Sequence, residues 1–146
     1  MIDKKWMGYE LPVSTLPLER GRLRAFARAV GEPDPVYVDV EAARAAGYPD
    51  LPAPPTFLFA AELDSGTQMA MAEAMGISLA KLLHGEQGFT YHRPACAGDT
   101  VTVRTRISEI YDKKGGALEF VVTLSEVRNQ HDDLVAELRN VLVCRH

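Results

Sequence analysis

Acid–base chemistry is the first kind of reaction that the polar residues of this chain suggest. Carboxylates gather in a glycine- and proline-rich segment, residues 31–39, which holds Glu32, Asp34 and Asp39 together with Tyr37. A general acid or base works best when its pKa lies near the working pH, and an unperturbed tyrosine, with a pKa of about 10, is a poor base. The segment therefore offers carboxylates for proton transfer but no histidine.

The four histidines all lie beyond the middle of the sequence, at His84, His92, His131 and His146. His131 falls in an expected turn and His146 ends the printed sequence. His84 leads into an expected strand and His92 follows it, so either side chain could face a cleft or a subunit interface. Histidine is the commonest general base, and we take His84, ahead of His92, as a candidate for that role.

Bulk composition limits the classes of protein to which the chain can belong. With 146 residues, 47% hydrophobic and 25% charged, it is long enough for one domain with a buried core. The net charge of −4 comes from interspersed cations and anions, so no basic stripe predicts nucleic-acid binding. Cys96 and Cys144 form neither a disulfide framework nor a zinc motif. Without a signal peptide or an apolar stretch of about 20 residues, we expect a cytoplasmic protein that does not enter a membrane.

The first half of the chain is predicted to be helical and interrupted by prolines. Apolar residues recur with helical spacing over residues 19–30, at Leu23, Phe26, Ala27 and Val30. Gly31 and the prolines that follow it end this helix. Asp39 is expected to cap a second, short helix at residues 40–46, because its carboxylate can accept hydrogen bonds from the free N–H groups of the first turn.

A proline-rich segment, residues 48–55, fixes an extended path toward a third helix. We expect Thr56 to cap that helix, and residues 57–63, which are apolar almost all round, to be buried. Residues 68–83 are typical of a further helix that is interrupted at Gly76.

From His84 onward the hydrophobic period changes to two, which is typical of strands. Alternating segments at 87–91, 101–107, 118–126 and 135–143 are separated by turns that contain glycine or asparagine. The last three strands are expected to form an antiparallel meander. One buried helix followed by such a sheet predicts an α+β fold in which the sheet wraps around the helix.

Four segments, taken in order, carry a resemblance to a known family: residues 31–39, 42–48, 53–57 and 92–99. Together they resemble the MaoC-like (R)-specific hydratases and dehydratases, which act on acyl thioesters and have the hot-dog fold. The resemblance implies a single hot-dog domain over residues 1–146, with an antiparallel sheet wrapped around a long central helix. It also implies no metal and no cofactor, with acyl-CoA or acyl-ACP as the substrate.

Within that family the chain is most similar to the N-terminal MaoC dehydratase, or FAS1-like dehydratase, group. This group includes the first subunit of the mycobacterial (3R)-hydroxyacyl-ACP dehydratases, which lacks the catalytic Asp and His and pairs with a second subunit that supplies them. Aligned on Pro35, this chain has Glu32 at the family's Asp position and Tyr37 at its His position. The resemblance therefore implies a subunit that holds the acyl chain and lacks the usual dyad.

Hydration of an enoyl thioester needs an acid–base pair, a polarised thioester oxygen and an apolar slot for the acyl chain. The candidates for the acid–base groups are Glu32, Tyr37 and His84. Glutamate is one methylene longer than the family's aspartate, and catalysis is sensitive to displacements of about 1 Å. The simpler explanations are a solvated loop acid for Glu32 and a packed aromatic for Tyr37.

The resemblance implies substrate contacts at the start of the central helix and after the first long strand. Pro55, Thr56 and Phe57 bring a rigid segment into a helix N-terminus, where unpaired N–H groups can polarise the thioester oxygen. Arg93 can meet a CoA phosphate. The simpler explanations are a plain N-cap with Phe57 in the core, and a surface cation for Arg93.

Four functions remain open from the sequence. The first is a half-site subunit that completes a dehydratase with a catalytic partner. The second is a self-sufficient homodimeric enoyl-CoA hydratase that uses Glu32 or His84. The third is a hot-dog acyl-CoA thioesterase with Glu62 or Asp64 as its carboxylate, against which the Pro35 segment argues. The fourth is a non-enzymatic acyl-binding module. An exposed sheet edge predicts a dimer, either with itself or with a second hot-dog subunit.

Overall fold

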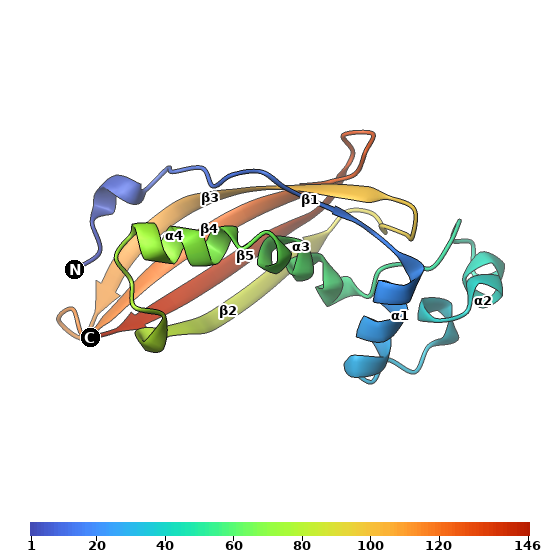
Figure 1. Cartoon of the computed structure of the whole chain (residues 1–146), viewed down its shortest axis with the longest axis horizontal. Coiled ribbons are helices and arrows are strands. Elements are labelled where there is room, and N and C mark those ends of the chain that lie inside the picture. The colour runs from blue at the N-terminus through green and yellow to red at the C-terminus, as the bar shows by residue number, and fades with distance from the viewer.

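A five-stranded antiparallel sheet forms the largest part of the computed structural model, which describes residues 1–146 (Figure 1). The strands lie in the order β1-β3-β4-β5-β2. Their bounds are Ser14–Pro17 (β1), Leu82–Tyr91 (β2), Thr100–Lys113 (β3), Leu118–Arg128 (β4) and Leu134–Arg145 (β5). The meander predicted for β3, β4 and β5 is confirmed, and so is the α+β fold. The sequence does not predict β1, because four residues that end in proline give too short a pattern.

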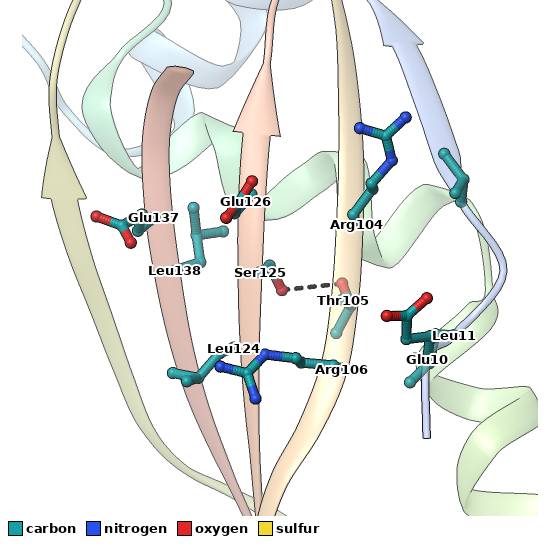
Figure 2. Close-up of a pocket in the computed structure, with 11 residues that line it drawn as sticks. Glu10, Leu11, Arg104, Thr105, Arg106, Leu124, Ser125, Glu126, Glu137 and Leu138 are labelled. Atoms are coloured by element: carbon teal, nitrogen blue, oxygen red, sulfur yellow. Dashed lines mark hydrogen bonds between the residues drawn. The ribbon is translucent and has the colours of Figure 1, made fainter. Parts of the chain in front are cut away.

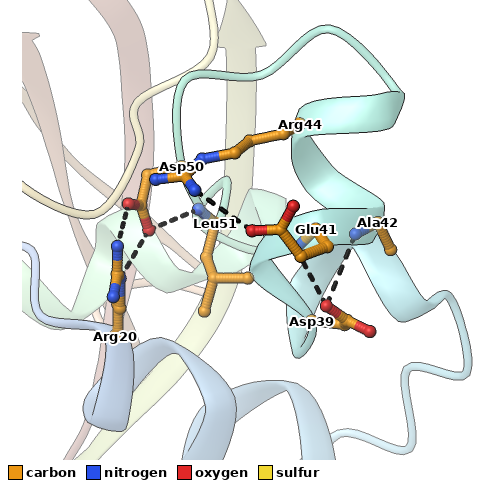
Figure 3. Close-up of polar contacts among 7 residues, drawn as sticks. All are labelled: Arg20, Asp39, Glu41, Ala42, Arg44, Asp50 and Leu51. Atoms are coloured by element: carbon orange, nitrogen blue, oxygen red, sulfur yellow. Dashed lines mark hydrogen bonds and ion pairs between the residues drawn. The ribbon is translucent and has the colours of Figure 1, made fainter.

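Two helices precede the central one and lie together at one end of the sheet (Figure 1). Helix α1 spans Arg20–Ala29 and α2 spans Val40–Ala45, as predicted. The Asp39 carboxylate caps α2 by accepting hydrogen bonds from the backbone N–H groups of Glu41, at 2.9 Å, and Ala42 (Figure 3). Single 3-10 turns occur at Lys4–Trp6, Pro35–Tyr37, Pro55–Leu58 and Leu79–Lys81.

The central helix crosses one face of the sheet in pieces (Figure 1). The 3-10 turn at Pro55–Leu58 leads into α3, Phe59–Asp64, and α4, Thr67–Ala74, follows after a break. The break falls at Ser65–Gly66, where Gly66 has a φ of +67° that a helix cannot accommodate. The central helix of the fold is therefore present, but it is not one continuous helix.

Three local predictions for this region are wrong. Thr56 does not cap the helix, because the N-cap position belongs to Pro54 and no side chain bonds there. Leu63 was expected in the core but is half exposed, because the buried positions of α3 are those of Ala61 and Glu62. The helix predicted to continue to residue 83 ends at Ala74, since the backbone turns at Gly76 and enters β2 at Leu82.

The core consists of two clusters, one toward each end of the sheet. The first cluster joins α1, the start of the central helix and the sheet through residues that include Leu23, Phe57 and Val103. The second lies under α4 and includes Met71 and Ile107. None of the helices is long and apolar enough to cross a bilayer.

Candidate functional site

A cavity of about 280 Å³ opens where the proline-rich segment meets the end of β2. We call it the tyrosine pocket, because Tyr37, Tyr48 and Tyr91 come together in its wall from three separate segments. The remaining lining residues are Pro52, Ala53, Pro55, Leu58, His92, Arg93, Pro94 and Ala95. All four segments that carry the family resemblance therefore contribute to this pocket, 31–39 through Tyr37 and 42–48 through Tyr48.

A larger hollow of about 410 Å³ lies against the other face of the sheet (Figure 2). Its charged lining includes Glu10 from the N-terminal segment, and Arg104, Arg106 and Glu126, which alternate along β3 and β4 with buried residues. None of the residues that the sequence singled out lies there. We therefore take the tyrosine pocket as the candidate site.

The turn that carries Tyr37 is held by its own carboxylates. The Asp34 carboxylate accepts a hydrogen bond from Val36 N–H at 3.0 Å and so caps the 3-10 turn. Glu32 Oε1 accepts one from Asp34 N–H at 3.1 Å. Burial raises the pKa of Tyr37, and the charge of Glu32 raises it further. The phenol thus stays protonated and acts as a hydrogen-bond donor, not as a base.

The proline-rich segment is fixed to α1 by an ion pair (Figure 3). The Arg20 guanidinium donates to both carboxylate oxygens of Asp50, at 2.9 and 2.5 Å. This contact holds the pKa of Asp50 at about 2, below its ordinary 3.8. Asp50 also accepts a hydrogen bond from Leu51 N–H at 2.8 Å. The chain that leads to Pro55 is therefore positioned before any ligand arrives.

At the start of the central helix, the three predicted contact residues separate. Pro55 lines the pocket. Thr56 is exposed, and its backbone N–H donates no hydrogen bond, so it is free for a ligand oxygen. Phe57 is 1% exposed and packs edge-on against Phe26, with ring centroids 5.3 Å apart. Phe57 is therefore a core residue.

The far wall of the pocket carries two paired side chains. His92 Nε2 lies 2.9 Å from Glu137 Oε2, and both groups are partly exposed. Arg93 forms an ion pair with Asp133 at 2.6 Å. His92 is the only imidazole that lines the pocket. The sequence ranked His92 below His84, because nothing local shows that Glu137, 45 residues away, lies beside it.

The structure does not bring the three acid–base candidates together. Glu32 and Tyr37 lie in one loop, but His84 is seven residues from Tyr91 along β2, about 23 Å in an extended strand. The His84 ring lies 5.1 Å from that of Phe59. A bulge between His84 and Glu86 turns these two side chains to opposite faces, and Glu86 pairs with Arg139 at 2.8 Å.

The carboxylates considered for a thioesterase lie elsewhere. Glu62 is 1% exposed in the core, and Ser125, Thr105 and Gln68 all donate hydrogen bonds to it. Burial raises its pKa despite these bonds. Asp64 pairs with Arg22 at 2.5 Å, and that pairing lowers its pKa. Neither carboxylate lines the tyrosine pocket.

The sheet order, the central helix and the pocket between the motif loop and the helix start define a hot-dog domain of the MaoC-like dehydratase type. The chain belongs to the family described as "FAS1-like, dehydratase domain region", whose model matches residues 5–138. A UPF0336 protein of Streptomyces avermitilis is 39% identical over 146 residues, covering 99% of this chain and 95% of the relative. One of Parafrankia sp. is 42% identical over 134 residues, covering 90% and 87%.

Solved structures agree with this assignment. The truncated HadBC (3R-hydroxyacyl-ACP dehydratase) complex of Mycobacterium tuberculosis contains a chain with 27% identity and a TM-score of 0.80, covering 97% of this chain and 99% of that one. The ChsH1-ChsH2 complex of the same organism shows the same fold at 21% identity and a TM-score of 0.71, covering 97% and 90%. The resemblance to MaoC-like dehydratases inferred from the motifs is confirmed.

Proposed function

We propose that this chain is a substrate-holding subunit of a (3R)-hydroxyacyl-thioester dehydratase and that a second hot-dog chain supplies the Asp and His. The observation that carries the proposal is the composition of the tyrosine pocket. Where the family has its dyad, this chain has Tyr37, which lines the pocket and has a raised pKa, and Glu32, which is not among the lining residues. A protonated phenol can orient a thioester but cannot remove a proton at neutral pH.

Binding functions are better supported than proton transfer. The free N–H of Thr56 lies at the start of the central helix beside Pro55, where it can donate to a thioester oxygen. Tyr37 and Tyr91 add phenol groups to a wall of proline, alanine and leucine. Such a lining, mostly apolar with a few polar groups, is typical of small-molecule sites. We expect acyl-CoA or acyl-ACP as the ligand, no cofactor, and a cytoplasmic location.

The partner is expected at strand β2. This edge strand is ten residues long and leaves one side of its backbone without a neighbouring strand. Leu83 and Tyr91 on this strand are large side chains that are about half exposed. Edge strands of this length invite pairing with another chain. The HadBC and ChsH1-ChsH2 neighbours, each a complex of two named subunits, support a heterodimer over a homodimer.

The test is an enoyl hydration assay on the chain alone and on the chain mixed with a hot-dog protein that carries the intact dyad. We expect activity only in the mixture, and loss of that activity when the partner's His is changed to Ala. Crotonyl-CoA hydration by the isolated chain at the rate of the mixture would contradict the proposal.

One observation favours the self-sufficient hydratase as second candidate. His92, paired with Glu137, lines the pocket and is the one imidazole available to act there. In that case the isolated chain would hydrate crotonyl-CoA, and His92→Asn would abolish the activity. Glu32→Gln and His84→Ala, made in parallel, separate this base from the two that the sequence indicated.

A further inference from the structure

A row of buried polar side chains crosses the helix-facing side of the sheet between the two core clusters. Thr123 on β4, Asn140 on β5 and Gln87 on β2 lie opposite one another in the strand register. Thr123 and Asn140 are each 1% exposed. Thr123 Oγ1, both amide atoms of Asn140 and Gln87 Oε1 are inaccessible and have no hydrogen-bond partner. We call these three residues the polar row.

Unpaired polar atoms are rare inside proteins, because each one loses its hydrogen bonds to water and gains none in return. Another buried polar side chain on this face of the sheet has its hydrogen bonds supplied by the protein. Glu62 lies beside the row and is bonded by Thr105, Ser125 and Gln68. The polar row has no such protein partners, so its atoms require water or a ligand.

The polar row reaches the surface at the seam between β2 and α3. Its last member, Gln87, is only half-buried, and the neighbouring Phe59 and His84 rings lie 5.1 Å apart at that edge. The helical layer is also interrupted at this level, because Glu62 and Gln68 flank the break at Ser65–Gly66. Gln87 is therefore the member of the row that lies closest to solvent.

An apolar stretch separates the row from the tyrosine pocket. Tyr91 in the pocket is opposite Ala136, and Asn140 is four residues further along β5, about 13 Å in an extended strand, which an alkyl chain of about ten methylene groups spans. Leu138 and Phe89, which pair with each other, lie between them on the same face. An acyl chain that starts at the pocket would cross this apolar stretch and then meet polar atoms.

We propose that the polar row is a subsite for a hydroxyl group carried in the middle of the ligand's acyl chain. The inference rests on the proposed function, in which the tyrosine pocket holds the thioester end. The unpaired set contains one amide donor, two amide oxygens that only accept, and the Thr123 hydroxyl, which can do both. A ligand hydroxyl can accept from Asn140 Nδ2 and donate to Gln87 Oε1, whereas a ketone could not donate.

The experiment measures the affinity of the purified chain for a long saturated acyl-CoA and for its isomers with one hydroxyl group at successive carbons. We expect one isomer, with its hydroxyl about ten carbons from the thioester, to bind about tenfold tighter than the unsubstituted chain. Thr123→Val and Asn140→Leu should each reduce that ratio toward one. Thr102→Val is the matched control, because Thr102 faces the opposite side of the sheet and bonds to no other side chain.

The ligand series in the unaltered chain decides the question even if Asn140→Leu fails to fold. Binding of the unsubstituted acyl-CoA with no preference among the isomers would overturn the subsite and leave the proposed function standing. A preference that survives Thr123→Val and Asn140→Leu would overturn it as well, as would a crystal structure of the complex with water on all four atoms. If no acyl-CoA binds, the subsite and the proposed function both fail.

Discussion

At the scale of single residues, the fold places a carboxyl group, Glu62, where water cannot reach it. Loss of hydration raises its pKa above the ordinary 4.5 and prevails over the hydrogen bonds from Ser125 and Thr105, which favour the charged form. The unfolded chain restores ordinary hydration. Folding therefore favours the protonated carboxyl, and the stability that this provides is complete below pH 4.5 and is lost as pH rises through the folded-state pKa.

Glu62→Gln removes this pH dependence. As pH rises above about 4.5, we expect the free energy of unfolding of the variant to increase relative to that of the unaltered protein, because only the unaltered protein loses stability there. Urea unfolding at a series of pH values measures the difference. Asp64→Asn is the control of opposite sign, because Arg22 lowers the pKa of Asp64 and its contribution is lost as pH falls below 3.8. Parallel pH profiles for Glu62→Gln and the unaltered protein would refute the argument.

At the scale of elements, the interruption of the central helix has a local backbone cause. Gly66 lies in the left-handed region with a φ of +67°, which costs residues with a Cβ about 1–2 kcal/mol. No atom lies within 4 Å of a Cβ built at this position, so conformation and not crowding decides the outcome of a substitution. A Cβ at Gly21 in α1 would likewise meet no atom within 4 Å, but the backbone there is helical.

This pair of glycines gives a matched test. Gly66→Ala should destabilise the protein by about 1 kcal/mol, because alanine resists the left-handed conformation. Gly21→Ala should stabilise it by about 0.5 kcal/mol through its better helix propensity. Thermal or urea unfolding of both variants measures the difference. Equal effects of the two substitutions would show that α3 and α4 can join into one helix at little cost.

At the scale of the whole molecule, the sheet has two edges of very different character. One edge strand is β1, which has four residues. The other is β2, which has ten residues and is mostly exposed. Leu83 and Tyr91, both about half exposed, lie on β2 itself. A partner that paired with β2 would cover both the backbone edge and this apolar surface.

Leu83→Lys on β2 should weaken assembly with a catalytic hot-dog partner about tenfold or more, because it places a charge in an apolar contact. Val13→Lys is the control, since Val13 has similar exposure and lies beside β1 at the opposite edge. Analytical ultracentrifugation of the chain with its partner checks both variants. A loss of assembly in Val13→Lys alone would place the interface at the β1 edge.

The sequence by itself determined the elements that depend on neighbours in the chain. Helical spacing predicted α1, the Asp39 carboxylate predicted the start of α2, and alternation predicted the long strands. The absence of any histidine before His84 likewise showed that the motif lacks its usual base. These features follow from residues a few positions apart, whose backbone preferences do not need the rest of the fold.

Only the tertiary structure decided which residues meet. The tyrosine pocket joins three distant segments, His92 finds Glu137 across the sheet, and a bulge turns Glu86 away from His84. The burial of Glu62 and the unpaired atoms of the polar row likewise depend on strand register and on the position of the central helix. Register and layer packing come from the summed burial of many side chains, so no short stretch of sequence specifies them.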